Sequence, residues 1–190
     1  MRLWRFDHFS FVAPFYDQVL RAPDPERLRT LLALPIEGLL LDVGGGTGRV
    51  AYTLRGSAGR IVVTDLSASM LAQAARKEGI IPLRAHAERL PFPDASVERI
   101  LVVDAFHHFC DQRAAAAELW RVLQAGGRLL VEEPNIEKIP VKAIALAERL
   151  ALMRSRFFSP ADMKSLFEAL GAQVEVHTDH ALSAWVIARK

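Results

Sequence analysis

The sequence predicts an α/β protein with a Rossmann-like, doubly wound sheet of seven strands, mostly parallel with an antiparallel C-terminal strand. Two observations carry this prediction. Short apolar runs alternate with segments of helical character along most of the chain. The first run, 39–43, is apolar except for Asp42 and leads directly into the glycine-rich stretch 44–48. Such a run is typical of a buried parallel strand that turns tightly toward a helix, expected here over 49–55.

The composition indicates one domain, 1–190, large enough for a sizeable core. The 190 residues are 51% apolar and 24% charged, with a net charge of +2. Lys and Arg are scattered, so we expect no nucleic-acid partner. The single cysteine, Cys110, excludes an internal disulfide and a Cys-rich metal site, and we expect no metal. No run reaches the ~18 uncharged apolar residues of a transmembrane helix, which favours a cytoplasmic protein.

The glycine-rich stretch has the spacing Asp42-x-Gly44-x-Gly46-x-Gly48. A dinucleotide fingerprint requires G-x-G-x-x-G, and its third glycine would fall on Arg49 when counted from Gly44. An NAD-dependent oxidoreductase is therefore disfavoured, although a nucleotide-type ligand at the end of the first strand is still expected.

The spacing of this loop resembles the first motif of class I S-adenosylmethionine (SAM) dependent methyltransferases. In that family the acidic residue and the glycines receive the methionine and ribose parts of SAM. The resemblance extends through three later motifs in the same order and covers nearly the whole chain. It is strongest to the type 11 group related to ubiquinone and menaquinone biosynthesis. It implies SAM as the cofactor and S-adenosylhomocysteine as the product.

The second apolar run, 60–64, ends at Asp65. A carboxylate at this position can accept hydrogen bonds from both ribose hydroxyls. The alternative is a cap for the following helix, a role that Ser67 can fill equally well. The family resemblance implies that Leu66 and Met70 flank the adenine, although a methionine at helical spacing is often simply core.

A third strand is expected over 80–85, followed by a proline-containing turn segment. The segment after this strand resembles the family motif Gly-Asp-Ala-Glu-x-Leu-Pro-Phe, which implies that Ala87 and Glu88 lie beside the adenine. The sequence departs from the motif at His86, where the family commonly has an Asp that faces the adenine amino group. An imidazole nitrogen or a backbone carbonyl can still accept that hydrogen bond.

The fourth strand, 97–104, ends at Asp104, and its carboxyl end abuts the same crevice as the glycine loop. We therefore include Asp104 among the cofactor-binding residues. His107 and His108 follow and are candidates for a base or an orienting group at the methyl-transfer site. Histidines that merely pack or face solvent are the alternative. Consecutive residues cannot all converge on one ion, so we reject a metal site here.

The remaining elements complete the predicted sheet. We expect a helix over 112–123 with a glycine stop, a fifth strand ending at Pro134, and a helix from Ser159 to Gly171. The runs 174–177 and 183–188 are expected to form an antiparallel pair. Strands and helices are expected to alternate until that pair.

Two segments outside this pattern are expected to cover the site. The aromatic-rich residues 1–34 are interpreted either as lid helices or as helices packed on the core. Family resemblance implies that Tyr16 lies over the cofactor and that an insertion, 135–158, caps the substrate pocket.

These observations predict an enzyme that transfers the methyl group of SAM to a small, hydrophobic molecule by in-line displacement. The alternative is a non-catalytic SAM-binding module within a pathway complex. The expected partner is the small-molecule acceptor, and the expected oligomeric state is a monomer or a homodimer.

Overall fold

The computed structural model describes residues 22–142, 155–178 and 182–190. Along the chain its elements are α3 (Pro25–Leu32), β1 (Ile36–Val43), α4 (Arg49–Thr53), β2 (Ala58–Asp65), α5 (Ala68–Ala74), β3 (Ile80–Arg84), β4 (Val97–Val103), the 3-10 helix η1 (Phe106–His108), α6 (Gln112–Val122), β5 (Leu123–Pro134), α8 (Pro160–Glu168), β6 (Gln173–Thr178) and β7 (Ser183–Arg189).

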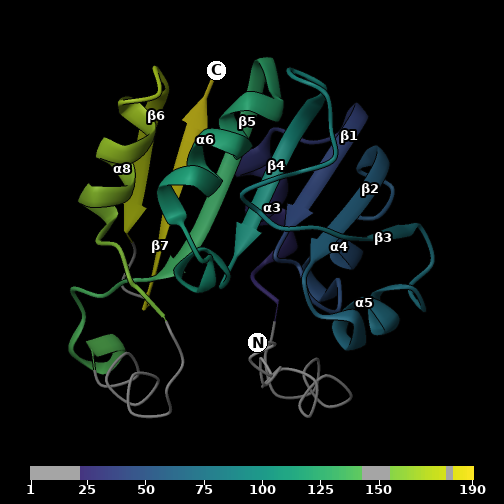
Figure 1. The fold of residues 1–190 in the computed structure, drawn as a ribbon, viewed down its shortest axis with the longest axis horizontal. Coiled ribbons are helices and arrows are strands. Elements are labelled where there is room, and N and C mark those ends of the chain that lie inside the picture. Colours follow the sequence, from purple (N-terminus) through teal and green to yellow (C-terminus); the bar gives the residue numbers. More distant parts are fainter. Residues whose placement is uncertain (1–21, 143–154, 179–181) are drawn as a thin grey trace, which may run out of the picture.

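The strands form one seven-stranded sheet in the order β3-β2-β1-β4-β5-β7-β6 (Figure 1). β1 to β5 pair in parallel, whereas β7 lies antiparallel between β5 and β6. The predicted fold class is therefore confirmed, including the antiparallel C-terminal strand. The strand order reverses between β1 and β4, where an open α/β sheet forms its ligand crevice.

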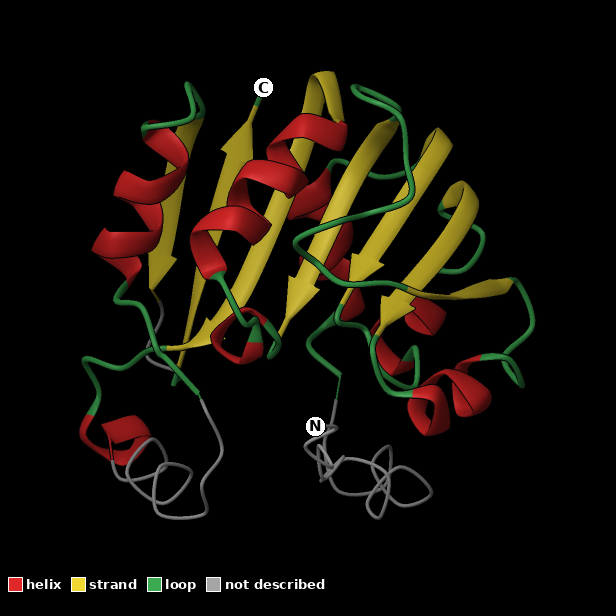
Figure 2. Cartoon of the chain, viewed as in Figure 1, coloured by secondary structure: helices red, strands yellow, loops and turns green. Residues whose placement is uncertain are grey.

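Alternation along the strands gives the sheet two apolar faces. Leu39 and Leu41 of β1 face α6 and α8, whereas Leu40 faces α3, α4 and α5. Figure 2 shows these helices on opposite sides of the strands. Because both faces are covered, the central strands are apolar almost throughout, as their sequences predicted.

The connection from β3 to β4 contains no helix, which corrects the expected strict alternation. Residues 85–96 cross in front of β2 and β1 as an extended loop (Figure 1). Ala87 and Leu90 from this loop are buried against the sheet face. Pro91 and Pro93 supply no backbone N–H, so a regular helix is disfavoured there.

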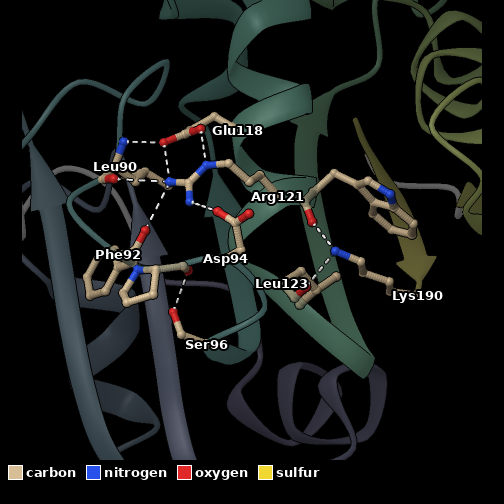
Figure 3. Close-up of polar contacts among 10 residues, drawn as sticks. Leu90, Phe92, Asp94, Ser96, Glu118, Arg121, Leu123 and Lys190 are labelled. Atoms are coloured by element: carbon tan, nitrogen blue, oxygen red, sulfur yellow. Dashed lines mark hydrogen bonds and ion pairs between the residues drawn. The ribbon is translucent and has the colours of Figure 1, made fainter.

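The loop is held against α6 by Arg121 (Figure 3). The Arg121 guanidinium donates to the carbonyl oxygens of Leu90 and Phe92 and pairs with Asp94 and Glu118. Glu118 also accepts the Leu90 N–H at 2.7 Å. Arg121, near the end of α6, therefore holds the β3–β4 connection in place.

Residues 22–34, the described part of 1–34, pack on the core, whereas the aromatic segment behind the lid prediction lies outside the described residues. Helix α3 begins at the Asp24 cap, and Leu28 and Leu32 are completely buried against the sheet. Its last carbonyls accept hydrogen bonds from Arg99, near the amino end of β4, and from Arg128, in the middle of β5. This helix therefore belongs to the core, which is the alternative that the sequence left open.

α6 and α8 both end earlier than predicted. α6 ends at Val122, and Leu123 already has an extended backbone that pairs with Val97 of β4. α8 ends at Glu168, ahead of Gly171. Within the described ranges, no helix is long and apolar enough to cross a membrane.

Candidate functional site

The glycine loop lies at the carboxyl end of β1, beside the ends of β2 and β4. Its N–H groups at Gly44 and Gly45 both donate to the Thr64 carbonyl of β2. Gly46 has φ +56, a left-handed conformation that a β-carbon disfavours. The helix that follows, α4, is shorter than expected and ends at Thr53.

Asp65 closes this loop from the tip of β2. Its Oδ2 accepts the Gly46 N–H at 3.0 Å and its Oδ1 accepts the Ser67 N–H at 2.8 Å. Ser67 is the cap of α5, because its hydroxyl accepts the Met70 N–H. A carboxylate oxygen can accept more than one hydrogen bond, so these two backbone contacts are compatible with a carboxylate that also binds ligand hydroxyls.

The Met70 side chain and the Asp65 carboxylate both lie next to Gly46 of the glycine loop. A β-carbon placed on Gly46 would lie 3.9 Å from both Asp65 Oδ2 and Met70 Sδ. Met70 is buried at 3% exposure, whereas the neighbouring Leu66 is 38% exposed. An exposed leucine beside a half-buried carboxylate is an apolar surface on which a flat ring can stack.

The β3–β4 loop begins beside Asp65. The Ala85 N–H donates to the Asp65 carbonyl at 3.2 Å. Ala87 is buried, and the Glu88 carboxylate accepts the Asp111 N–H at 3.0 Å. Glu88 therefore ties the loop to the start of α6, while the exposed His86 ring lies 3.7 Å from Glu88 Oε2.

Asp42 lies beneath the loop and is only 1% exposed. Neither of its carboxylate oxygens makes a hydrogen bond of ordinary geometry within the described part of the chain. A β-carbon on Gly45 would overlap this carboxylate, so the glycine is required for the close approach. Burial raises the Asp42 pKa from 3.8 to about 7, although the charge of Arg49 partly opposes this rise.

Arg49 is a positively charged residue near several acidic residues at the strand ends. Its Nη2 lies 3.4 Å from Asp104 Oδ2, and its side chain is 9% exposed. Burial raises the Asp104 pKa, and burial together with Asp104 raises the Glu132 pKa to about 8. Asp42, Asp104 and Glu132 thus share the field of one guanidinium. Sequence reasoning missed the role of Arg49, which it treated only as an absent glycine.

The two histidines occupy different environments. His107 is 4% exposed, and its Nδ1 lies 2.5 Å from Glu133 Oε2. His108 Nδ1 lies 3.1 Å from the Ser155 hydroxyl. Burial, followed by the charge of His107, lowers the His108 pKa from 6.5 to about 3. His108 is therefore neutral throughout the physiological range, and Glu133 is a second residue that the sequence reasoning missed.

Comparison with known proteins identifies the family. The family model described as a methyltransferase domain matches residues 41–131, which span the glycine loop, Asp65 and the end of β4. Residues 41–131 thus match a methyltransferase domain, and the chain is similar to the class I SAM-dependent methyltransferases. The YcgJ protein of Bacillus subtilis has a similar structure, with a TM-score of 0.74 and 26% identity over 81% of this chain and 70% of that one.

Curated relatives of this methyltransferase come from quinone pathways. The demethylmenaquinone methyltransferase of Thermus thermophilus is 36% identical over 139 residues, which are 66% of this chain and 63% of that protein. The ubiquinone/menaquinone biosynthesis C-methyltransferase UbiE of Francisella philomiragia is 37% identical over 112 residues, 54% of this chain and 45% of that protein. The chain thus matches less than two thirds of the length of each of these relatives.

Some predicted site residues of this methyltransferase lie beyond the described ranges. Tyr16 is among them, as are residues 143–154 of the predicted cap. At the ends of the cap, residues 139–142 are helical and Ser155 begins an extended segment. Among the described residues there is no cluster of His, Cys, Asp and Glu that would hold a metal ion.

Proposed function

We propose that the chain binds SAM and transfers its methyl group to a small, hydrophobic acceptor. The observation that carries this proposal is the junction of Gly46, Asp65 and Met70 at the carboxyl ends of β1 and β2, beside the point where the strand order reverses. In this proposal the loop backbone receives the methionine part, Asp65 binds the ribose, and Leu66, Met70 and Ala87 enclose the adenine. Glu88 holds the adenine-side loop in place.

The charges at the strand ends support a cationic ligand. Asp42, Asp104 and Glu132 all lie within the electrostatic influence of Arg49, and the pKa values of these three acids are raised. SAM carries an ammonium and a sulfonium, whereas NAD carries a pyrophosphate. A cation bound beside carboxyl groups of raised pKa favours their ionised form and is then attracted to them, whereas a pyrophosphate there would be repelled.

Methyl transfer requires little covalent help from the protein. The acceptor atom attacks the sulfonium methyl in line, the carbon–sulfur bond breaks, and neutral S-adenosylhomocysteine remains. The protein must hold the acceptor about 3 Å from the methyl carbon and exclude water. His107 and His108 remain the candidates for orienting the acceptor or taking a proton.

For the acceptor we propose a reduced 1,4-naphthoquinone or benzoquinone ring, methylated at carbon. The names of the curated relatives, demethylmenaquinone methyltransferase and ubiquinone/menaquinone C-methyltransferase, support this class. The ring carbon is nucleophilic in the hydroquinone form, and it loses its proton after the new carbon–carbon bond has formed. We also propose a cytoplasmic location and a monomer or homodimer.

The test is methyl transfer from tritiated SAM to 1,4-naphthohydroquinone under anaerobic reducing conditions. The expected result is labelled 2-methyl-1,4-naphthohydroquinone, identified by mass spectrometry. Tight SAM binding with no label on any hydroquinone or phenol would favour the non-catalytic module. Binding of NAD in preference to SAM by calorimetry would overturn the proposal.

A further inference from the structure

The carboxylate of Glu133 accepts hydrogen bonds from the backbone segment that follows β4. Its Oε1 accepts the N–H groups of Ala105 at 2.9 Å and Phe106 at 2.7 Å. Its Oε2 accepts the His107 N–H at 3.3 Å and lies 2.5 Å from the His107 ring nitrogen Nδ1. Glu133 is only 3% exposed, so these contacts are shielded from water.

This arrangement is needed because η1 is short. A single turn of 3-10 helix leaves its first N–H groups without carbonyl partners from the same turn. Here those donors are buried together with Ala105, Phe106 and His107. Leaving buried N–H groups unsatisfied destabilises a local conformation strongly, so one carboxylate from β5 determines the path of the loop after β4.

The loop in turn holds the segment that returns from the predicted cap. The Arg156 N–H donates to the His107 carbonyl at 2.9 Å. Gln112 Nε2 donates to both the Phe106 and Arg156 carbonyls, at 2.9 and 2.7 Å. The Phe157 ring stacks on the His107 ring, with centroids 4.4 Å apart. Residues 106–107 and residues 156–157, which are far apart in sequence, are therefore in direct contact.

We propose that Glu133 is the positioning residue for the acceptor side of the site: it fixes residues 105–107 and, through His107, residues 155–158. The inference rests on the proposed function, because it requires that a methyl acceptor binds on this side of the site. Glu133 touches neither cofactor nor acceptor in this account. It acts through His107, whose ring and carbonyl join the two segments.

The first experiment is amide hydrogen exchange of the Glu133→Gln variant, which needs no acceptor. Glutamine keeps the side-chain length, but its amide nitrogen cannot accept the His107 donors. We expect exchange at His107 and Arg156 to accelerate roughly ten- to a hundredfold, and exchange at Ala105 and Phe106 to change less, because the glutamine oxygen can still accept their N–H groups. Exchange at Gly44 and Gly45, bonded to Thr64, should be unchanged. Normal exchange at Arg156 would overturn the coupling to the cap segment.

Glu98→Gln is the matched control. The Glu98 carboxylate also accepts a backbone N–H, from Gly38 at 3.0 Å, but it lies near the amino end of β4. This variant should leave exchange at residues 105–107 and at Arg156 unchanged, because any effect is confined to the neighbourhood of Gly38. Acceleration of residues 105–107 in this control would mean that Glu133→Gln acts by general destabilisation, which would overturn the inference.

The second experiment separates the two proposals. With 1,4-naphthohydroquinone as the probe, Glu133→Gln should lower kcat about 10²-fold, while SAM affinity measured by calorimetry stays unchanged. If wild-type protein methylates no probe, the proposed function fails and hydrogen exchange alone decides the role of Glu133. A full kcat for Glu133→Gln, alongside active wild type, would overturn the inference and leave the proposed function intact.

A second variant covers the case in which Glu133→Gln does not fold. His107→Asn retains the three backbone N–H groups that Glu133 accepts and removes the ring that stacks on Phe157. It should accelerate exchange at Arg156 and leave Ala105 and Phe106 protected. Equal exchange at all three positions would contradict the order of contacts from Glu133 through His107 to Arg156.

Discussion

Asp65 Oδ2 accepts the Gly46 N–H at 3.0 Å and so joins the acidic tip of β2 to the glycine loop of β1. The same carboxylate accepts the Ser67 N–H through its other oxygen. Both contacts hold the carboxylate in one orientation before any ligand arrives. A ligand hydroxyl therefore meets an acceptor that is already ordered, which lowers the entropic cost of binding.

Replacing Asp65 by Asn should weaken SAM binding by about 10²-fold, because hydrogen bonds to a charged acceptor contribute about 1.5–3 kcal/mol. Isothermal calorimetry measures the change. Asp162→Asn is the control, since Asp162 also accepts a backbone N–H, in the capping box of α8. The control should lower thermal stability without altering SAM affinity. Unchanged affinity in Asp65→Asn would show that the ribose assignment is wrong.

The raised pKa of Asp42 should make the stability of the folded protein depend on pH. Its folded pKa of about 7 exceeds the ordinary value of 3.8, so the folded state holds the proton more tightly. Its contribution is therefore greatest below about pH 4 and is lost as the pH rises to about 7. The loss is at most about 4 kcal/mol.

Asp42→Asn mimics the protonated acid and should remove this contribution to the pH dependence. In urea unfolding, the variant should gain stability relative to wild type at pH 8 and gain little at pH 4.5. Part of the slope should persist, because the Glu132 pKa is raised to about 8. An identical pH slope in both proteins would contradict a raised Asp42 pKa.

Arg121→Met should loosen the β3–β4 loop. The variant keeps the aliphatic stem and loses the donors to Leu90 and Phe92. Because the side chain is 34% exposed, we expect a loss of only about 1–2 kcal/mol. Limited proteolysis should then cut within residues 85–96.

Lys190→Met is its control, because Lys190 binds the carbonyls of Trp120 and Leu123 at the same end of α6 (Figure 3). Among the contacts described for Lys190, none involves the β3–β4 loop. Cleavage of the loop in both variants would show that the end of α6, rather than Arg121, protects it.

The low pKa of His108 predicts its behaviour in solution. With a folded pKa of about 3 against 6.5, its ring should remain neutral between about pH 5 and pH 8. Its Cε1 chemical shift should be flat over this range in the folded protein and should titrate in urea. The neutral ring stabilises the fold above pH 6.5, and this contribution is lost as the pH falls toward 3. A folded-state titration near 6.5 would refute the burial of this ring.

The sheet was predictable because each central strand is an apolar run that ends at a glycine, a proline or an acid. The β3–β4 connection was predicted in part, because a turn segment with Pro91 and Pro93 was expected there, whereas its path across β2 and β1 was not. The cofactor-side residues Gly46, Asp65 and Met70 meet as their positions at strand ends implied. Their binding roles remain predictions.

The acids Glu132 and Glu133 could not be interpreted from sequence in the same way. Two adjacent carboxylates at the end of a central strand are unusual, and that was the available signal. Their partners, Arg49 and His107, come from other elements and are brought near only by strand pairing. Sequence order alone does not reveal which acid faces which side of the sheet.

The pairing of β7 with β5 has a consequence for these two acids. Register partners run from Arg128↔Arg189 to Pro134↔Ser183, alongside the parallel pairing with β4. A slip of one residue would exchange Glu132 and Glu133 between the faces of the sheet, depriving His107 of its carboxylate. β7 supplies none of the site residues described here. Its pairing with β5 nevertheless determines which face of the sheet Glu132 and Glu133 occupy. Mutations in this antiparallel strand should therefore alter the acceptor loop before they alter the glycine loop.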